Sequence, residues 1–167
     1  MRARVFAALV GLVALASPAE LAAADGDSDF LAFSLGAFDL GDEETTAEAR
    51  IEYRSDRKVL YLGPMAGLMV NFDGGAYVYG GVYLDLLFGR RWVVMPSLAV
   101  GAYREGDGKD LGGTLEFRSG VEVSYRLGNG SRIGIAFHHI SNAGLRDKNP
   151  GAESLVFTYA VPFDTLF

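Results

Sequence analysis

Cysteine is absent from this chain of 167 residues, and histidine occurs only twice, as His138 and His139. Without cysteine no disulfide can stabilise an exported chain, so stability must come from a core or from closure of a sheet. Neighbouring residues on a strand point to opposite faces, so the two histidines cannot share one zinc ion. No zinc or other metal site is therefore expected.

Positive charge is also scarce, because 15 lysines and arginines face 21 aspartates and glutamates, which gives a net charge of −6. An acidic chain is a poor partner for the phosphate backbone of nucleic acid. The composition therefore argues against nucleic-acid binding.

The N-terminal segment has the features of a secretory signal peptide. Arg2 and Arg4 precede an apolar run from Val5 to Ala16, and a small-x-small cleavage site follows at Ala22-Ala23-Ala24. The run is too short to span a bilayer, which disfavours the alternative of a permanent anchor helix. We expect residues 1–24 to be removed, which leaves residues 25–167 as one domain with a net charge of −7.

Beyond the signal peptide no apolar run approaches the roughly 18 residues of a membrane-spanning helix. The chain is nevertheless 50% hydrophobic, with 22 glycines, 8 tyrosines and 11 phenylalanines. A transmembrane β-strand needs only about 9 to 11 residues, of which every second one faces lipid. Eight alternating segments are found, at residues 30–39, 46–54, 60–72, 77–88, 92–105, 115–126, 132–141 and 153–167. The sequence therefore predicts an all-β protein, an eight-stranded antiparallel transmembrane β-barrel.

Two of these segments carry a charged row opposite an apolar row. In residues 46–54 the row is Glu48, Arg50, Glu52 and Arg54, and in residues 115–126 it is Glu116, Arg118, Glu122 and Arg126. Such rows suit a polar lumen with lipid outside, and the terminal Phe167 is typical of an outer-membrane assembly signal. A secreted sandwich or lipocalin-like barrel, with the charged rows in water, is the alternative.

Three polar residues interrupt the apolar face near the end of the chain. The alternation places His139 and Ser141 on that face of segment 132–141, and Glu153 on the same face of the next segment. If a hairpin sets 139 opposite 153, their Cβ atoms lie about 5 Å apart. A serine that attacks an ester needs an adjacent base, and the base needs an acid to orient it. The sequence therefore suggests an esterase site, whose chemistry needs no cofactor, while His138 points into the lumen.

The parity of the strands predicts which side of the membrane the site faces. With the mature N-terminus in the periplasm, the turns after the first, third, fifth and seventh segments lie outside. His139, Ser141 and Glu153 then lie in the outer leaflet of a Gram-negative outer membrane. The abundant acyl esters in that leaflet belong to lipopolysaccharide, which the position nominates as the substrate.

The motif His139-Ile140-Ser141-Asn142, Gly144, Asn149-Pro150-Gly151 and Glu153 resembles the C-terminal signature of the PagL family, the outer-membrane lipid A 3-O-deacylases. The resemblance implies a serine esterase with Ser141 as nucleophile, His139 as general base and Glu153 as its orienter. It further implies that Asn149, with a backbone N–H near Gly144, stabilises the oxyanion, and that Asn142 is critical to the site.

Other readings stay open at this point. A non-catalytic structural or adhesin-like barrel would carry the same strands, and a homodimer in the bilayer is an alternative to a monomer. Arg146 and Lys148, beside the site, are candidates to meet lipid A phosphates. Acyl-chain selectivity is not encoded in any pattern that the sequence shows.

Overall fold

The computed structural model describes residues 28–43 and 45–166. The expected signal peptide at residues 1–24 and the terminal Phe167 lie outside the described residues. Over those residues the chain is almost entirely β-structure, as the alternation of apolar and polar residues predicted. No helix in this part of the chain is long and apolar enough to cross a membrane.

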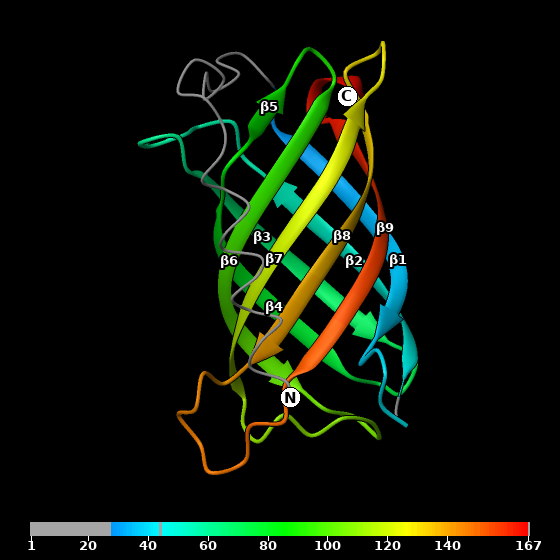
Figure 1. Ribbon diagram of the computed structural model, residues 1–167, viewed down its shortest axis with the longest axis vertical. Coiled ribbons are helices and arrows are strands. Elements are labelled where there is room, and N and C mark those ends of the chain that lie inside the picture. Colours follow the sequence, from blue (N-terminus) through cyan, green and yellow to red (C-terminus); the bar gives the residue numbers. More distant parts are fainter. Residues whose placement is uncertain (1–27, 44, 167) are drawn as a thin grey trace.

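The strands form one closed antiparallel barrel (Figure 1). They are β1 (Phe30–Phe38), β2 (Thr46–Arg54), β3 (Gly63–Asn71), β4 (Ala76–Tyr83), β5 (Leu86–Phe88), β6 (Trp92–Arg104), β7 (Leu115–Arg126), β8 (Arg132–Ser141) and β9 (Ala152–Pro162). Their order around the sheet is β4-β3-β2-β1-β9-β8-β7-β6-β5, and pairing of β4 with β6 closes it. The short β5 continues β4 along β6, so β4 and β5 together count as one strand of the barrel. The barrel therefore has eight strands, which confirms the predicted fold.

Three details of the prediction were wrong. β3 begins at Gly63 rather than residue 60, because Leu60 and Tyr61 adopt positive φ angles of 51° and 69° in a turn. The last strand does not run to the end of the chain, since a 3₁₀ helix at Phe163–Thr165 follows β9. In the expected segment 77–88, strict alternation places Leu86 on the lipid face, opposite to the face of Tyr83 and Asp85. The structure instead buries both Leu86 and Asp85 at the break between β4 and β5, which shifts the alternation by one residue.

Paired charges from opposite walls fill the lumen. Arg54 of β2 donates to Glu122 of β7 at 2.7 Å, and Arg118 of β7 donates to Glu52 of β2 at 2.8 Å. All four side chains are almost fully buried, so the attraction between them is weakly screened. The charged rows therefore face inward, as predicted, and tie two strands together across the barrel.

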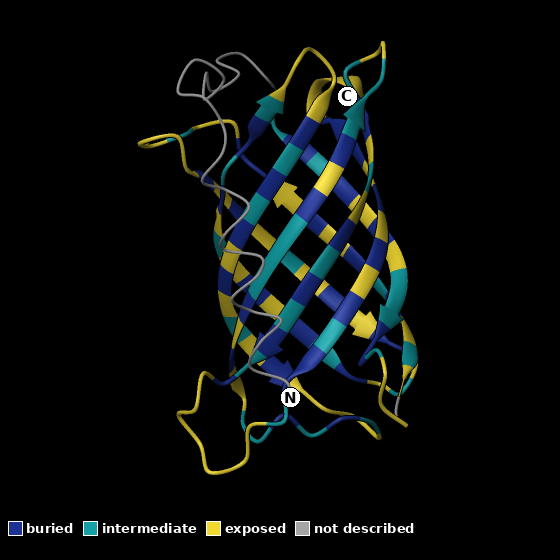
Figure 2. Cartoon of the chain, in the orientation of Figure 1, coloured by how far each residue is buried: buried dark blue, intermediate teal, exposed yellow. Residues whose placement is uncertain are grey.

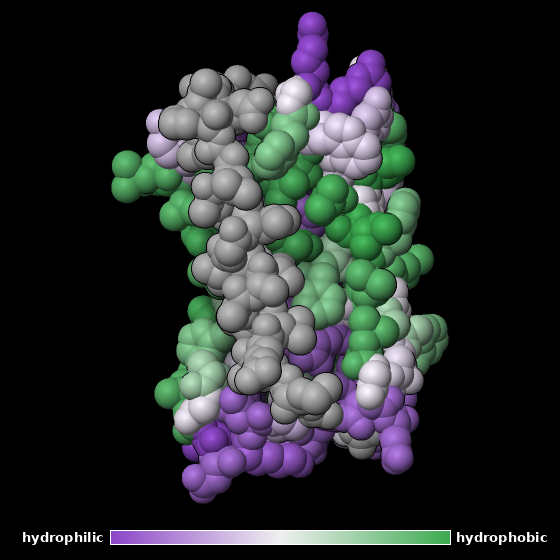
Figure 3. Space-filling view, viewed as in Figure 1, coloured by the Kyte–Doolittle hydropathy of each residue, from purple (hydrophilic) through white to green (hydrophobic). Residues whose placement is uncertain are grey.

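The outer surface is apolar between polar ends. Figure 2 shows buried and exposed residues alternating along each strand, and Figure 3 shows hydrophobic atoms along the wall with hydrophilic atoms at both ends. The most exposed apolar residues of the strands include Leu35, Val78, Leu98, Ile135 and Phe157. At the end near the C-terminus, Trp92 and Tyr125 pack edge to face at 5.2 Å between ring centroids. This pattern is that of a lipid-facing belt with an aromatic girdle.

Candidate active site

The hairpin of β8 and β9 brings His139 and Glu153 together. The register pairs these two residues directly, which is the arrangement that the esterase hypothesis required. His139 Nδ1 lies 3.2 Å from Glu153 Oε1, within hydrogen-bonding distance. The side chains are 27% and 43% exposed, so the pair lies on the outer, lipid-facing wall rather than in the lumen. The carboxylate can therefore fix the orientation of the imidazole from the membrane side.

Ser141 ends β8 on the same outward face as His139, two residues further along. It is half-buried, and its partner across the ladder with β7 is Phe117. In Figure 1 the loop that follows it, drawn in orange, lies at the opposite end of the barrel from the C-terminus. Ser141, His139 and Glu153 thus share one outward patch at the extracellular rim.

A second serine, Ser119, lies beside this patch and was missed by sequence reasoning. It belongs to β7, is half-buried, and is paired with His139 on the side away from Glu153. Directly paired residues have Cβ atoms about 4.5 to 5.5 Å apart. A lone serine in a strand carries no motif. Ser119 could have been identified only by combining the alternation of residues 115–126 with the β7–β8 register, which the sequence does not show.

Gly151 packs against the ring of His139. A Cβ atom at this position would lie 2.8 Å from His139 Cε1 and 3.5 Å from Nε2. The residue also has a φ angle of 68°, in the region that favours glycine. Both the backbone conformation and the space above the imidazole therefore require glycine, the last residue of the Asn-Pro-Gly motif.

Asn142 holds the loop of residues 142–151 in shape. Its side chain is fully buried, and Nδ2 donates to the carbonyl oxygens of Leu111 at 3.0 Å and Lys148 at 2.8 Å. Its Oδ1 accepts the backbone N–H of Gly144 at 3.1 Å, and its own N–H donates to Asn149 Oδ1 at 3.0 Å. One buried amide therefore links Gly144 and Asn149 into a single network.

Asn142, Gly144 and Asn149, which were expected at the oxyanion site, are thus linked by hydrogen bonds, and each has a distinct partner. The backbone N–H of Gly144 donates to Asn142, and this hydrogen bond follows from the left-handed conformations of Ala143 and Gly144, with φ angles of 55° and 77°. Because Asn149 Oδ1 accepts the N–H of Asn142, its Nδ2 is directed away from that contact. The loop network therefore holds Asn149 through its Oδ1.

The loop between β6 and β7 packs against the site loop. Lys148 Nζ donates to Asp110 Oδ2 at 2.7 Å, and Gly112 N–H donates to Asp110 Oδ1 at 2.7 Å. These hydrogen bonds, first that of Lys148, lower the pKa of the Asp110 carboxyl. Lys148, a candidate phosphate contact, thus pairs with a carboxylate, whereas the Arg146 side chain lies against Gly113.

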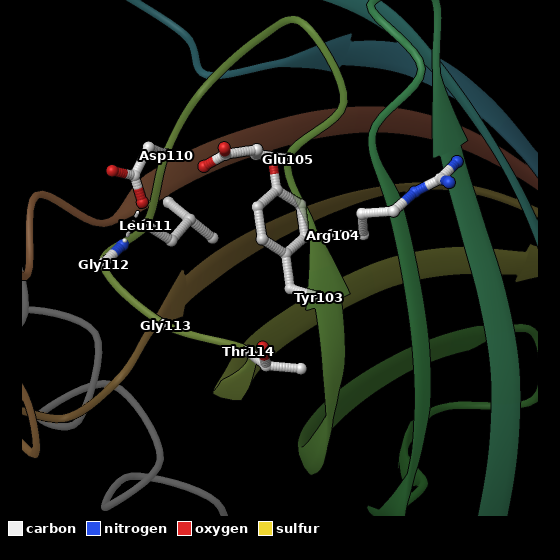
Figure 4. Close-up of a pocket in the computed structure, with 8 residues that line it drawn as sticks. All are labelled: Tyr103, Arg104, Glu105, Asp110, Leu111, Gly112, Gly113 and Thr114. Atoms are coloured by element: carbon white, nitrogen blue, oxygen red, sulfur yellow. Dashed lines mark hydrogen bonds between the residues drawn. The ribbon is translucent and has the colours of Figure 1, made fainter.

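A pocket lies within this neighbouring loop rather than at His139 (Figure 4). It is lined by Tyr103, Arg104, Glu105, Asp110, Leu111, Gly112, Gly113 and Thr114. Arg104 extends away from Asp110 and Leu111, so the lining does not gather its charges on one point. Within residues 28–43 and 45–166 no group of three or more histidine, aspartate or glutamate side chains could hold a metal ion.

An eight-stranded barrel with a lipid-facing belt and a charge-paired lumen defines an outer-membrane β-barrel, and His139 and Glu153 pair on its outer wall. The model of one family, described as "Lipid A 3-O-deacylase (PagL)", matches residues 44–162. The chain belongs to the PagL family, as the C-terminal motif predicted.

Individual relatives agree with this assignment. The chain is 37% identical over 59 residues to the lipid A deacylase PagL of Pseudomonas aeruginosa, covering 35% of this chain and 34% of the relative. It is 33% identical over 55 residues to that of Bordetella bronchiseptica, covering 33% and 31%. The matched segments thus span about a third of these curated relatives.

Solved structures share the fold. The crystal structure of the outer membrane enzyme PagL gives a TM-score of 0.63 at 22% identity, covering 80% of this chain and 99% of that one. Neisserial surface protein A gives a TM-score of 0.62 at 11% identity, covering 83% and 99%. The barrel architecture is therefore common to both proteins.

Proposed function

We propose that the chain is a lipid A deacylase that hydrolyses the ester-linked 3-hydroxyacyl chain at the 3-position, with Ser141, His139 and Glu153 as its triad. The observation that carries the proposal is the 3.2 Å contact of His139 with Glu153, on the outward face of a PagL-family barrel and two residues from Ser141. Membership of the family, described as 3-O-deacylase, supports the substrate and the position.

The position of the patch supports a lipid substrate. The site faces the membrane at the extracellular rim, so the ester of an outer-leaflet lipid can reach it without leaving the bilayer. Polar groups on the lipid side of a barrel are costly, by about 2 to 4 kcal/mol for a cation at the midplane and far less near the interface. A polar patch kept at this rim is therefore better explained by chemistry than by packing.

His139 acts as the base in the proposed mechanism. Glu153 accepts a hydrogen bond from Nδ1–H, so the basic lone pair resides on Nε2. Nε2 takes the hydroxyl proton as Ser141 Oγ attacks the ester carbonyl. Collapse of the tetrahedral intermediate returns that proton to the departing sugar oxygen and leaves an acyl-serine. A water molecule, activated by the same histidine, then releases the 3-hydroxy fatty acid and restores Ser141.

Asn149 is the proposed oxyanion donor, because the Asn142 N–H holds its Oδ1 and its Nδ2 carries N–H groups that can donate. Asn142 supports it from the interior, and Gly144 contributes a second N–H if substrate binding releases that group from Asn142. A preorganised donor in a water-poor site stabilises the developing charge by about 2.7 to 4 kcal/mol. The mechanism uses residues of one chain, so it does not require a homodimer.

The test exploits the two serines beside His139. Wild type, Ser141→Ala and Ser119→Ala are expressed in a host without such an enzyme, and their lipid A is examined by mass spectrometry. We expect Ser141→Ala to lose at least about 1,000-fold of the deacylation rate, as removal of a nucleophile does elsewhere. Ser119→Ala should keep the reaction. The reverse result would make Ser119 the nucleophile and refute the proposed triad.

The same experiment addresses the bond that is cleaved. Fragmentation of the product should place the loss at the 3-position, with release of one 3-hydroxy fatty acid. Loss of a chain at another position would refute the regiochemistry while leaving a deacylase. If the folded wild-type barrel removes no chain from hexa-acylated lipid A, the non-catalytic barrel is the correct reading.

A further inference from the structure

The turn between β2 and β3 carries an exposed apolar tip at the end of the barrel opposite the active site. The tip consists of residues 59–62, Val59-Leu60-Tyr61-Leu62, with exposed fractions of 71%, 86%, 56% and 42%. The strand parity places this turn on the periplasmic side. Four consecutive apolar residues that project from a short turn are unusual in water, where such runs favour aggregation.

The backbone conformation of the tip is also unfavourable for leucine and tyrosine. Val59 and Leu62 exchange two backbone hydrogen bonds, of 2.9 and 3.0 Å, around Leu60 and Tyr61. Both central residues have positive φ angles, 51° and 69°, as in a type I′ turn, where Asn-Gly is the preferred pair. Bulky side chains are strained in this conformation. Since neither water nor the turn favours leucine and tyrosine here, they indicate a contact outside the chain.

The base of the turn is fixed to the barrel. Asp56 donates its backbone N–H to Asp29 Oδ1 at 2.8 Å, and the Tyr83 hydroxyl donates to the carbonyl oxygen of Ser55 at 2.8 Å. These contacts join the turn to the segment before β1 and to β4. Residues 59–62 are therefore held out from the wall on a rigid base.

The direction of the tip identifies its surroundings. In Figure 1 the turn after β2 extends sideways from the wall, below the level of the C-terminal 3₁₀ helix. Figure 3 shows hydrophobic atoms at the outermost edge of the molecule on that side. The tip thus extends sideways from the wall, at the height of the strands, rather than along the barrel axis.

The charge beside the tip fits a phospholipid surface. Arg57 is exposed and precedes the tip by two residues, and Lys58 is half-buried, with its Nζ 3.4 Å from Asp85. A basic side chain next to apolar residues can extend to lipid phosphates while the apolar groups enter the acyl region. Tyrosine is enriched at that boundary.

We propose that residues 59–62 insert into the headgroup–acyl boundary of the periplasmic leaflet, and that Arg57 contacts phospholipid phosphates there. The tip is a lateral anchor, which fixes the depth of the barrel from the side opposite its active site. This role is independent of the proposed reaction.

The chain has a single tryptophan, Trp92, so the depth of the tip can be measured by fluorescence. In a Trp92→Phe background, Tyr61→Trp is reconstituted in bilayers of phosphatidylethanolamine and phosphatidylglycerol. Asn129→Trp, in the exposed turn between β7 and β8 at the same end, is the matched control. We expect tryptophan at 61 to emit at shorter wavelength, to be quenched by lipids brominated near the headgroup, and to resist aqueous iodide.

Two outcomes would overturn the proposal. Iodide quenching at position 61 as strong as at position 129 would place the tip in water. Quenching by bromolipid that falls as the protein-to-lipid ratio rises would show that a second copy of the chain covers it instead.

A second variant separates the turn from the membrane. Leu60→Asn combined with Tyr61→Gly installs the preferred type I′ pair and removes the apolar side chains of the two central residues. If the tip is an anchor, this variant should unfold at lower urea concentration than wild type in the same bilayers, despite its relaxed turn. A higher urea midpoint would show that turn strain outweighs any membrane contact, and would refute the anchor.

Discussion

Replacing Gly151 by alanine tests whether the position of the His139 ring controls activity. The new Cβ would lie 2.8 Å from Cε1 of the imidazole, about 0.6 Å closer than ordinary van der Waals contact. Because Glu153 holds the ring from the other side at 3.2 Å, the ring cannot move without changing its hydrogen bond. The perturbation therefore acts on the proposed base without removing any catalytic group.

The magnitude follows from two separate effects. Alanine at a φ angle of 68° costs about 1 to 2 kcal/mol of backbone strain, which affects stability. Displacement of a catalytic group by about 1 Å can cost on the order of 100-fold in rate. A shift of about 0.6 Å should then lower the deacylation rate by roughly 10-fold to 100-fold, while the barrel stays folded.

The control is Gly41→Ala, in the loop between β1 and β2. Gly41 has a φ angle of 82°, but nothing lies within 4 Å of the place that its new methyl group would take, so this variant shares the backbone strain and lacks the ring contact. Initial rates of lipid A deacylation are compared at equal amounts of folded barrel. Equal losses in the two variants, or full activity in Gly151→Ala, would refute the argument that glycine is required to seat the imidazole.

Three further changes probe the orienting acid, the lumen and the outer loops. Glu153→Gln keeps the shape but removes the charge that stabilises an imidazolium, so the rate should fall by about 100-fold or more; a loss of less than about threefold, measured by lipid A mass spectrometry, would contradict the triad. Glu52→Gln deprives Arg54 and Arg118 of a buried partner at 2.8 Å from each, and should destabilise the barrel by about 3 to 5 kcal/mol, seen as a lower urea midpoint in bilayers with activity per folded molecule retained. An unchanged midpoint would show that the lumen network is not stabilising. Hydrogen bonds from Lys148 and Gly112 lower the pKa of Asp110. The stabilisation of the loop by this carboxylate is therefore complete above pH 3.8, its ordinary pKa, and is lost as the pH falls through the lower pKa of the folded state. In limited proteolysis, the loop at residues 142–151 should therefore be protected at pH 5 and become more accessible only below about pH 3.8. The Asp110→Asn variant should already be accessible at pH 5. If protection changes in neither case, the Lys148–Asp110 pair does not hold the loop in place.

The architecture could be predicted because alternation reports directly on the two faces of a barrel wall. The charged rows from Glu48 to Arg54 and from Glu116 to Arg126 face inward as expected, because a charged side chain that faced lipid would find no partner and would destabilise the barrel. The alternation placed His139 and Glu153 on the same outer face, but their direct pairing could only be assumed, because the long loop at residues 142–151 does not by itself fix the register.

What the sequence did not reveal depends on contacts between segments distant along the chain. Ser119 enters the patch only through the β7–β8 register, and the role of Asn142 depends on the carbonyl of Leu111 in another loop. Leu86 was misplaced because a break at the preceding residues resets the alternation, and a period of two carries no mark of such a break. The tip at Leu60-Tyr61 was included in a strand because its residues have high strand propensity but adopt a turn.

In the proposed reaction the substrate reaches His139 and Glu153 by lateral diffusion in two dimensions, because both side chains are exposed on the lipid-facing wall. The quantity that saturates it is then the mole fraction of lipid A in the leaflet, not a concentration in solution. Adding inert phospholipid or detergent at constant total lipid A should slow the reaction by surface dilution alone. The released fatty acid also starts in the membrane, so clearance of product becomes a property of the bilayer around the barrel.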